Sequence, residues 1–180
     1  MLLITWKGDA NEAARLLASG PTASRSEPRT IWVTAIVQLC QREPAAVLKT
    51  LNLSSDDYIQ DNGFAGPKTY FTGRAHAMAG RQEAARLAWE AGLAVVNARL
   101  KTSPESLMMH LRRGELLAWL GQADEALQEA RTVAGLMRSD RSAWFVSEAL
   151  IYAAPGRADE AVPLLENICA PSAGKTSAGR

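Results

Sequence analysis

The sequence predicts an all-α protein built as a stack of antiparallel helix pairs. One short phrase recurs along the chain, and its five copies begin at residues 8, 41, 80, 121 and 156. Each copy consists of a turn residue, a few polar residues, and then Glu-Ala or Ala-Ala. No segment shows the alternation of polar and apolar residues that is typical of a sheet. A recurrence at this spacing is typical of repeat architectures in which each unit is one pair of helices.

Small residues recur at fixed distances from each turn. Five residues after the turn the chain has an alanine each time: Ala13, Ala46, Ala85, Ala126 and Ala161. Seven residues before the turn it again has small residues: Thr34, Gly73, Gly114 and Ala149. Two helices that cross closely need small side chains where their backbones approach. The pattern therefore predicts the register of the pairs, with turns at Gly8, Gln41, Gly80, Gly121 and Gly156.

The turns divide the chain into alternating first and second helices. The first helices of the pairs are predicted at about 29–41, 67–79, 105–120 and 141–154. The second helices are predicted at about 9–19, 44–51, 82–101, 123–137 and 158–168. Residues 52–66 are predicted to be a loop, because Ser54-Ser55-Asp56-Asp57 and Asp61-Asn62-Gly63 are typical of turns.

The two ends of the sequence carry separate expectations. Only about seven residues precede the turn at Gly8, so we expect about four complete pairs and a truncated first pair. The open end of such a stack exposes apolar surface. Either an upstream segment completes the first pair, or a second subunit covers that end in a homodimer. Residues 1–169 are expected to form the helical domain, and the small, polar residues 170–180 to be disordered.

These turns, small residues and spacings resemble the tetratricopeptide repeat (TPR) family over most of the chain, most strongly over residues 107–166. The resemblance implies a right-handed superhelical solenoid whose first helices line a concave groove. It also implies that a partner peptide or helix binds there. On this resemblance the groove is apolar and aromatic, with two charged residues, and its lining residues are Tyr70, Arg74, Met78, Met108, Leu111, Glu115 and Trp119.

Composition excludes several other classes of function. Lys and Arg total 20 and Asp and Glu total 19, so a net charge of +1 gives no attraction to nucleic acid or to an anionic membrane. No apolar run approaches the ~18 residues of a membrane span. The two cysteines, Cys40 and Cys169, are too few for a disulfide framework or a metal site. We therefore expect a cytoplasmic protein with a protein or peptide partner and no cofactor.

Three functions remain open on the sequence. The first is a non-catalytic interaction scaffold, similar to the C-terminal repeat arrays of bacterial multi-domain regulators. The second is a free-standing small chaperone or assembly factor. The third is an enzyme that uses His76 or His110 with nearby carboxylates. The acidic residues of the second helices are expected to be solvated rather than catalytic: Glu83, Glu90, Glu125, Glu129, Asp159 and Glu160.

Overall fold

The structure is a computed structural model that describes residues 9–61, 63–136, 151 and 162. Within these residues the protein is mostly helical, with seven α-helices, a short 3-10 helix η2 (Thr22–Ser26) and one β-hairpin. The α-helices are α1 (Ala10–Ala18), α2 (Pro28–Cys40), α3 (Pro44–Leu51), α4 (Lys68–Met78), α5 (Gln82–Leu100), α6 (Leu107–Trp119) and α7 (Ala123–Leu136). All seven lie within two residues of the predicted ranges. The ranges 141–154 and 158–168 and the tail 170–180 fall outside the described residues, except for Ile151 and Val162, which are helical.

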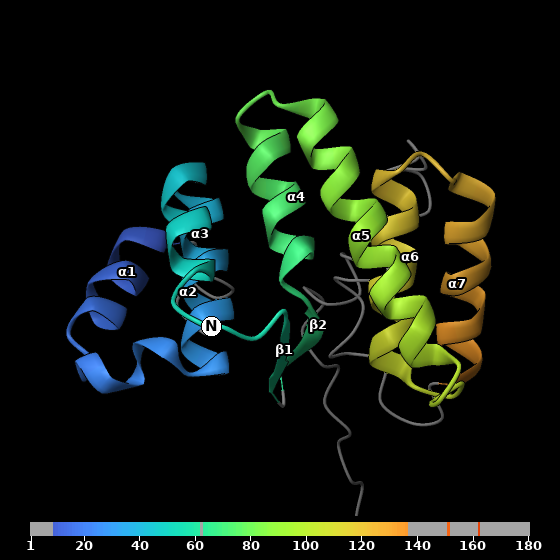
Figure 1. The fold of residues 1–180 in the computed structure, drawn as a ribbon, viewed down its shortest axis with the longest axis horizontal. Helices are drawn as coiled ribbons and strands as arrows, with labels where there is room; N and C mark the ends of the chain where they lie inside the picture. The colour runs from blue at the N-terminus through green and yellow to red at the C-terminus, as the bar shows by residue number, and fades with distance from the viewer. Residues whose placement is uncertain (1–8, 62, 137–150, 152–161, 163–180) are drawn as a thin grey trace, which may run out of the picture.

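Helix boundaries follow from ordinary capping chemistry. Pro28 and Pro44 each stand at the first position of a helix, where the missing N–H costs nothing. Asp9 caps α1, and its carboxylate accepts a hydrogen bond from the Glu12 backbone N–H at 2.8 Å. Consecutive helices pack against each other and follow an arc from α1 to α7 (Figure 1).

Three helix reversals share one backbone geometry. The backbone N–H three residues after the last residue of the helix donates to the carbonyl five residues before it. The three bonds run from Glu43 to Gln38, from Arg81 to His76, and from Gln122 to Leu117, each at 2.9 Å. The residue just before each donor has a left-handed backbone. These residues are Arg42 (φ 60°), Gly80 (φ 73°) and Gly121 (φ 76°).

The predicted register is therefore wrong by one residue at the second turn. The turn residue is Arg42 and not Gln41, because Arg42 has the conformation of Gly80 and Gly121. Counting from Arg42, the position five residues later is the fully buried Val47 instead of Ala46. The small position seven residues earlier is Ala35 instead of Thr34, and Ala35 is also fully buried.

Replacing Arg42 by glycine is expected to stabilise the protein by about 1 kcal/mol. A residue with a Cβ atom is strained in the left-handed region, and glycine is not. Thermal or urea denaturation measures the gain. The matched control is Gly80→Ala, which introduces at an equivalent turn the strain that Arg42→Gly removes and should destabilise by a similar amount. Equal stability of the Arg42→Gly variant and the wild type would contradict the assignment.

A two-stranded hairpin interrupts the helical series between α3 and α4. Strands β1 (Tyr58–Asp61) and β2 (Phe64–Pro67) pair antiparallel, with Tyr58 opposite Pro67 and Asp61 opposite Phe64. The prediction of a loop over residues 52–66 is wrong here, although Asp61 does make a turn contact, accepting a hydrogen bond from the Gly63 N–H at 2.9 Å. Every residue of β2 is buried. Strand β1 contacts α2, and β2 contacts α5 and α6.

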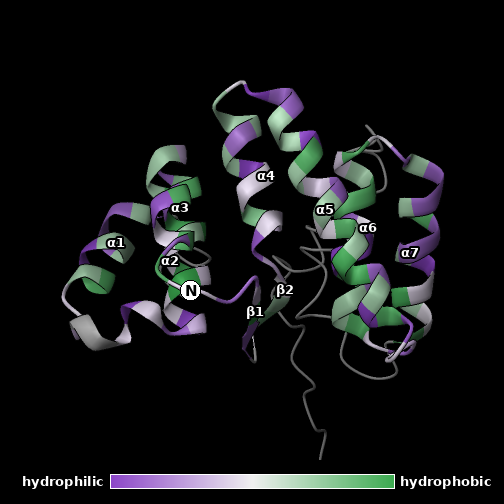
Figure 2. Cartoon of the chain, in the orientation of Figure 1, coloured by the Kyte–Doolittle hydropathy of each residue, from purple (hydrophilic) through white to green (hydrophobic). Residues whose placement is uncertain are grey.

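The main core forms around the hairpin residue Phe64. Its ring lies 6.2 Å from that of Trp32 on α2, 5.5 Å from that of Tyr70 on α4, and 4.9 Å from that of Phe71, centroid to centroid. A second, smaller core joins α6, α7 and Ile151. Figure 2 shows hydrophobic residues on α6 and mainly hydrophilic residues along the outer side of α7. The hairpin therefore contacts helices of three successive pairs, namely α2, then α4 and α5, then α6.

Among the described residues, no helix combines the length and the apolar character needed to cross a membrane.

Candidate functional site

The seven predicted groove residues do not form one open surface. Tyr70 is 3% exposed, Leu111 is fully buried, and Glu115 is 1% exposed. The prediction that these three line a groove is corrected, because the hairpin and the side chains of neighbouring helices cover this face. Met108 is partly buried against both cores, and Met78, at the end of α4, is 41% exposed.

Three of the predicted residues do meet, in an aromatic cluster between α4, α5 and α6. The ring of Trp119 lies 4.9 Å from that of Tyr70 and 5.4 Å from that of Trp89. The Arg74 guanidinium lies over two of these rings, 5.9 Å from the centroid of Tyr70 and 5.6 Å from that of Trp119. Such contacts contribute about 0.5–1 kcal/mol each at partly exposed sites. Trp119 therefore packs between helices, and its replacement is expected to weaken folding.

A buried ion pair on α6 lies next to this aromatic cluster, against the ring of Tyr70. Arg112 donates to Glu115 one turn later on α6, and their side chains are 6% and 1% exposed. The Arg112 guanidinium also lies 5.0 Å from the ring centroid of Phe64 and 4.8 Å from that of Tyr70. One side chain of α6 thus contacts both the hairpin and α4.

Alkaline pH is expected to destabilise the protein through Tyr70. Burial, and then the negative charge of Glu115, raises the pKa of Tyr70 from 10.0 to about 12. A raised pKa means that the folded state holds the phenol proton more tightly than the unfolded chain. The contribution of the Tyr70 proton to the unfolding free energy is therefore complete below pH 10. It decreases as the pH rises toward 12, by about 3 kcal/mol at most.

Urea denaturation between pH 9 and 12 measures this loss, with Tyr70→Phe as the control. The Phe variant lacks the titrating hydroxyl, so its stability should fall less over the same range. Parallel losses in the two proteins would contradict the assignment.

A second polar cluster joins α6 to α7 and to the segment before α6. His110 places Nδ1 2.6 Å from Glu129 Oε2 and Nε2 2.8 Å from the carbonyl oxygen of Pro104. Arg113 donates to the other oxygen of Glu129. Glu129 is 4% exposed, so the expectation that it is solvated is wrong. The basic partners of Glu129 come from another helix and could not be inferred from spacing along α7.

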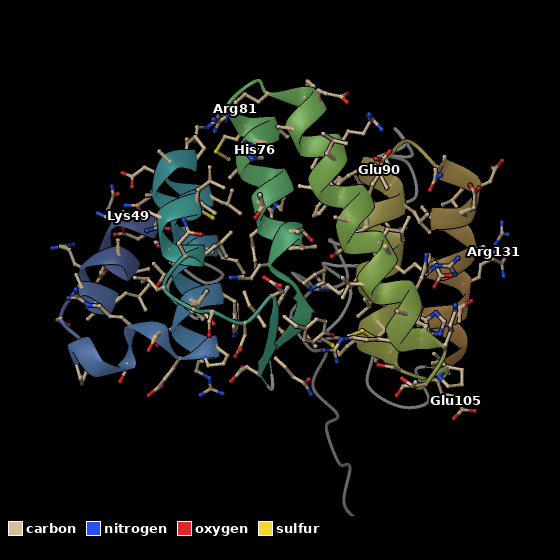
Figure 3. The ribbon with its side chains drawn as sticks, viewed as in Figure 1. Lys49, His76, Arg81, Glu90, Glu105 and Arg131 are labelled. Atoms are coloured by element: carbon tan, nitrogen blue, oxygen red, sulfur yellow. The ribbon has the colours of Figure 1, made fainter. Side chains whose placement is uncertain are left out.

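The two histidines lie in different surroundings. Both ring nitrogens of His110 face protein acceptors. His76 lies near the end of α4, on the same side of the molecule as Arg81 (Figure 3). Burial, and then the positive charge of Arg81, lowers the pKa of His76. Its Nδ1 is buried and has no hydrogen bond to a described residue. No three His, Cys, Asp or Glu side chains gather in a metal-binding cluster anywhere in the described part of the chain.

An open groove of about 440 Å³ lies between α1, α2 and α3. We call it the α1–α3 groove. Its α1 wall is apolar and consists of Ala14, Leu17 and Ala18. On the other side, Leu53 follows α3 and is 50% exposed. A concave, partly apolar surface with a few polar groups is the usual form of a binding site.

The floor of the α1–α3 groove is a row of polar side chains along α2. The row consists of Thr30, Thr34, Gln38 and Gln41, all partly exposed and all lining the groove. Gln38 accepts a hydrogen bond from Thr50, and Gln41 donates one to Asn11, each at 2.9 Å. The Gln38 amide nitrogen, the Gln41 amide oxygen and both threonine hydroxyls form no hydrogen bond to a described residue. The floor therefore keeps both donors and acceptors for a ligand.

A charged residue lies at each end of this groove. Arg25 lies just before α2 and Glu43 just after it, and both line the groove. Within the described residues neither forms an ion pair. A second groove of about 300 Å³, between α5 and the α6–α7 turn, differs in this respect. There Arg86 is paired with Glu90, which lines the same groove and is labelled in Figure 3.

The sequence contained a signal for the α1–α3 groove that the repeat pattern did not reveal. Thr30, Thr34, Gln38 and Gln41 recur at intervals of four, four and three residues, so they lie on one face of a helix. A polar face on a helix normally indicates solvent exposure. Only the packing of α1 and α3 on either side of α2 turns that face into the floor of a groove.

No protein-family model matches the sequence, and no curated protein or solved structure matches it either. The family resemblance therefore rests on the turns and small residues of this chain. It stays a prediction, as does the cytoplasmic location.

Proposed function

We propose that the protein is a tetratricopeptide-like interaction module that binds a peptide segment of a partner protein in the α1–α3 groove. The observation that carries the proposal is the groove itself. It is open, has an apolar wall, and has a floor whose hydroxyl and amide groups are not fully used by the protein. Binding at this groove replaces the predicted binding on the face of α4 and α6.

The repeat character of the proposal is supported by the shared geometry of the helix reversals. Three turns use the same hydrogen bond and the same left-handed residue. Gly73 on α4 packs directly against Trp89 on α5, which is the close approach that small residues allow. The position five residues after the turn is fully buried in three pairs, at Val47, Ala85 and Ala126. A right-handed solenoid of such pairs is the arrangement we propose.

Selection of peptides from a phage-displayed random dodecapeptide library tests the proposal. Synthetic copies of the selected peptides are titrated against the full chain by isothermal calorimetry. The groove variant is Ala18→Trp, because Ala18 is exposed, lines the groove, and can carry an indole into it without disturbing the core. The matched control is Leu16→Trp on the same helix, which is 57% exposed and does not line the groove.

We expect selected peptides that bind the wild type and the Leu16→Trp variant equally and the Ala18→Trp variant at least about tenfold more weakly, a difference of about 1.4 kcal/mol. The proposal is wrong if no peptide is selected, or if every selected peptide binds the two tryptophan variants alike.

A further inference from the structure

We infer that the α1–α3 groove binds its peptide in an extended conformation, through the peptide backbone, with an acidic residue beside Arg25 and a basic residue beside Glu43. This inference rests on the proposed function and specifies the ligand of the same groove. Three observations carry it: the spacing of the polar floor, the chemistry of that floor, and the charges at its two ends.

The spacing of the floor matches an extended chain. Thr30, Thr34 and Gln38 are four residues apart on α2, so they are separated by about 6 Å along the helix axis. An extended peptide repeats its backbone orientation every two residues, which is about 6.6 Å. Successive floor residues can therefore meet successive backbone groups that point the same way. Gln41 adds a fourth contact at the end of the row.

The chemistry of the floor favours a backbone over a helix face. Hydroxyl and amide side chains donate and accept, as peptide N–H and C=O groups do. A bound helix satisfies its own backbone groups internally, so it would cover the floor and leave Thr30 and Thr34 without partners. An extended segment instead supplies a donor and an acceptor at each step. Its alternate side chains would pack on the apolar wall of α1.

The charges define the ends of the ligand. Arg25 and Glu43 flank α2, a helix of 13 residues and thus about 20 Å long. About six extended residues span that distance. Because neither charge is paired within the described residues, an acidic group near Arg25 and a basic group near Glu43 complete the two ion pairs. Such pairs at the rim of a site contribute mainly to selectivity and orientation.

Backbone N-methylation of the selected peptides tests the extended conformation. A peptide from the library that loses binding in the Ala18→Trp variant is resynthesised with one N-methyl group at each position in turn. Blocking an N–H that donates to the floor should weaken binding about fivefold or more, and the effect should recur at alternate residues. Equal tolerance of methylation at every position, or a helical circular-dichroism spectrum of the bound peptide, overturns the inference.

Charge reversal tests the orientation. Arg25→Glu should weaken the same peptide about fivefold or more, and replacing the peptide's acidic residue by Lys should restore binding to that variant. The matched control is Arg15→Glu on α1, which makes the same change of charge at an exposed residue outside the groove. If Arg25→Glu and Arg15→Glu act alike, the charge assignment is wrong. Groove binding shown by Ala18→Trp would then still stand, so the two failures are distinguishable.

Discussion

Replacing Glu115 by Gln is expected to lower the unfolding free energy by about 3–5 kcal/mol. Glu115 and Arg112 form an ion pair whose two side chains are almost fully buried. A neutral amide in place of the carboxylate removes the negative charge that faces the Arg112 guanidinium in the core, where Arg112 lies against the rings of Phe64 and Tyr70. Breaking a buried ion pair by removing one of its charges costs much more than breaking an exposed pair.

Urea denaturation followed by tryptophan fluorescence measures this loss. The matched control is Glu83→Gln, which removes a carboxylate from a surface pair with Arg86 whose side chains are 70% and 49% exposed. That change should cost no more than about 1 kcal/mol. Similar small losses of unfolding free energy in both variants would show that the buried pair does not stabilise the core.

A double variant separates the charge from the packing. Arg112→Met combined with Glu115→Leu removes both charges and keeps apolar side chains in their place. Because replacing a whole buried pair is often neutral or stabilising, this variant should be much more stable than Glu115→Gln alone. If the double variant is as unstable as the single one, the loss comes from shape and not from the unbalanced charge.

The helices could be predicted from the sequence because local signals define them. Proline at the start of α2 and α3, and glycine at the turns after α4 and α6, mark boundaries within the chain itself. The one register error fell where the signal was missing. Arg42 takes the conformation that glycine takes at the other turns, and nothing local in its sequence distinguishes it from Gln41.

The hairpin could not be predicted because its strands carry no alternation. Strand β2 reads Phe-Ala-Gly-Pro and is buried at every position, so polar and apolar residues do not alternate along it. The hairpin also explains the error in the predicted groove. Tyr70 and Glu115 interact with each other, but the Phe64 ring and the Arg112 guanidinium pack against the Tyr70 ring and cover it. A repeat pattern defines which face a residue occupies and does not reveal what covers that face.

Replacing Gly73 by Ala is expected to destabilise the protein by about 2–3 kcal/mol, although alanine is the better helix former by about 1 kcal/mol. A Cβ atom at Gly73 would lie within 3.0 Å of three atoms of the Trp89 indole. Trp89 cannot easily move away, because it is buried and its ring packs against Trp119. The helices α4 and α5 must therefore separate, or the indole must leave its position.

The matched control is Gly135→Ala in α7, where the added Cβ meets no atom of a described residue within 4 Å. That change keeps only the gain in helix propensity and should raise stability by up to about 1 kcal/mol. Urea denaturation of both variants should therefore give changes of opposite sign. A second cycle places Gly73→Ala in a Trp89→Leu background, where the indole is absent. There the alanine should cost little, because the group that it would strike has been removed. If Gly73→Ala costs as much without the indole as with it, close packing of Gly73 against Trp89 is not what sets the distance between α4 and α5.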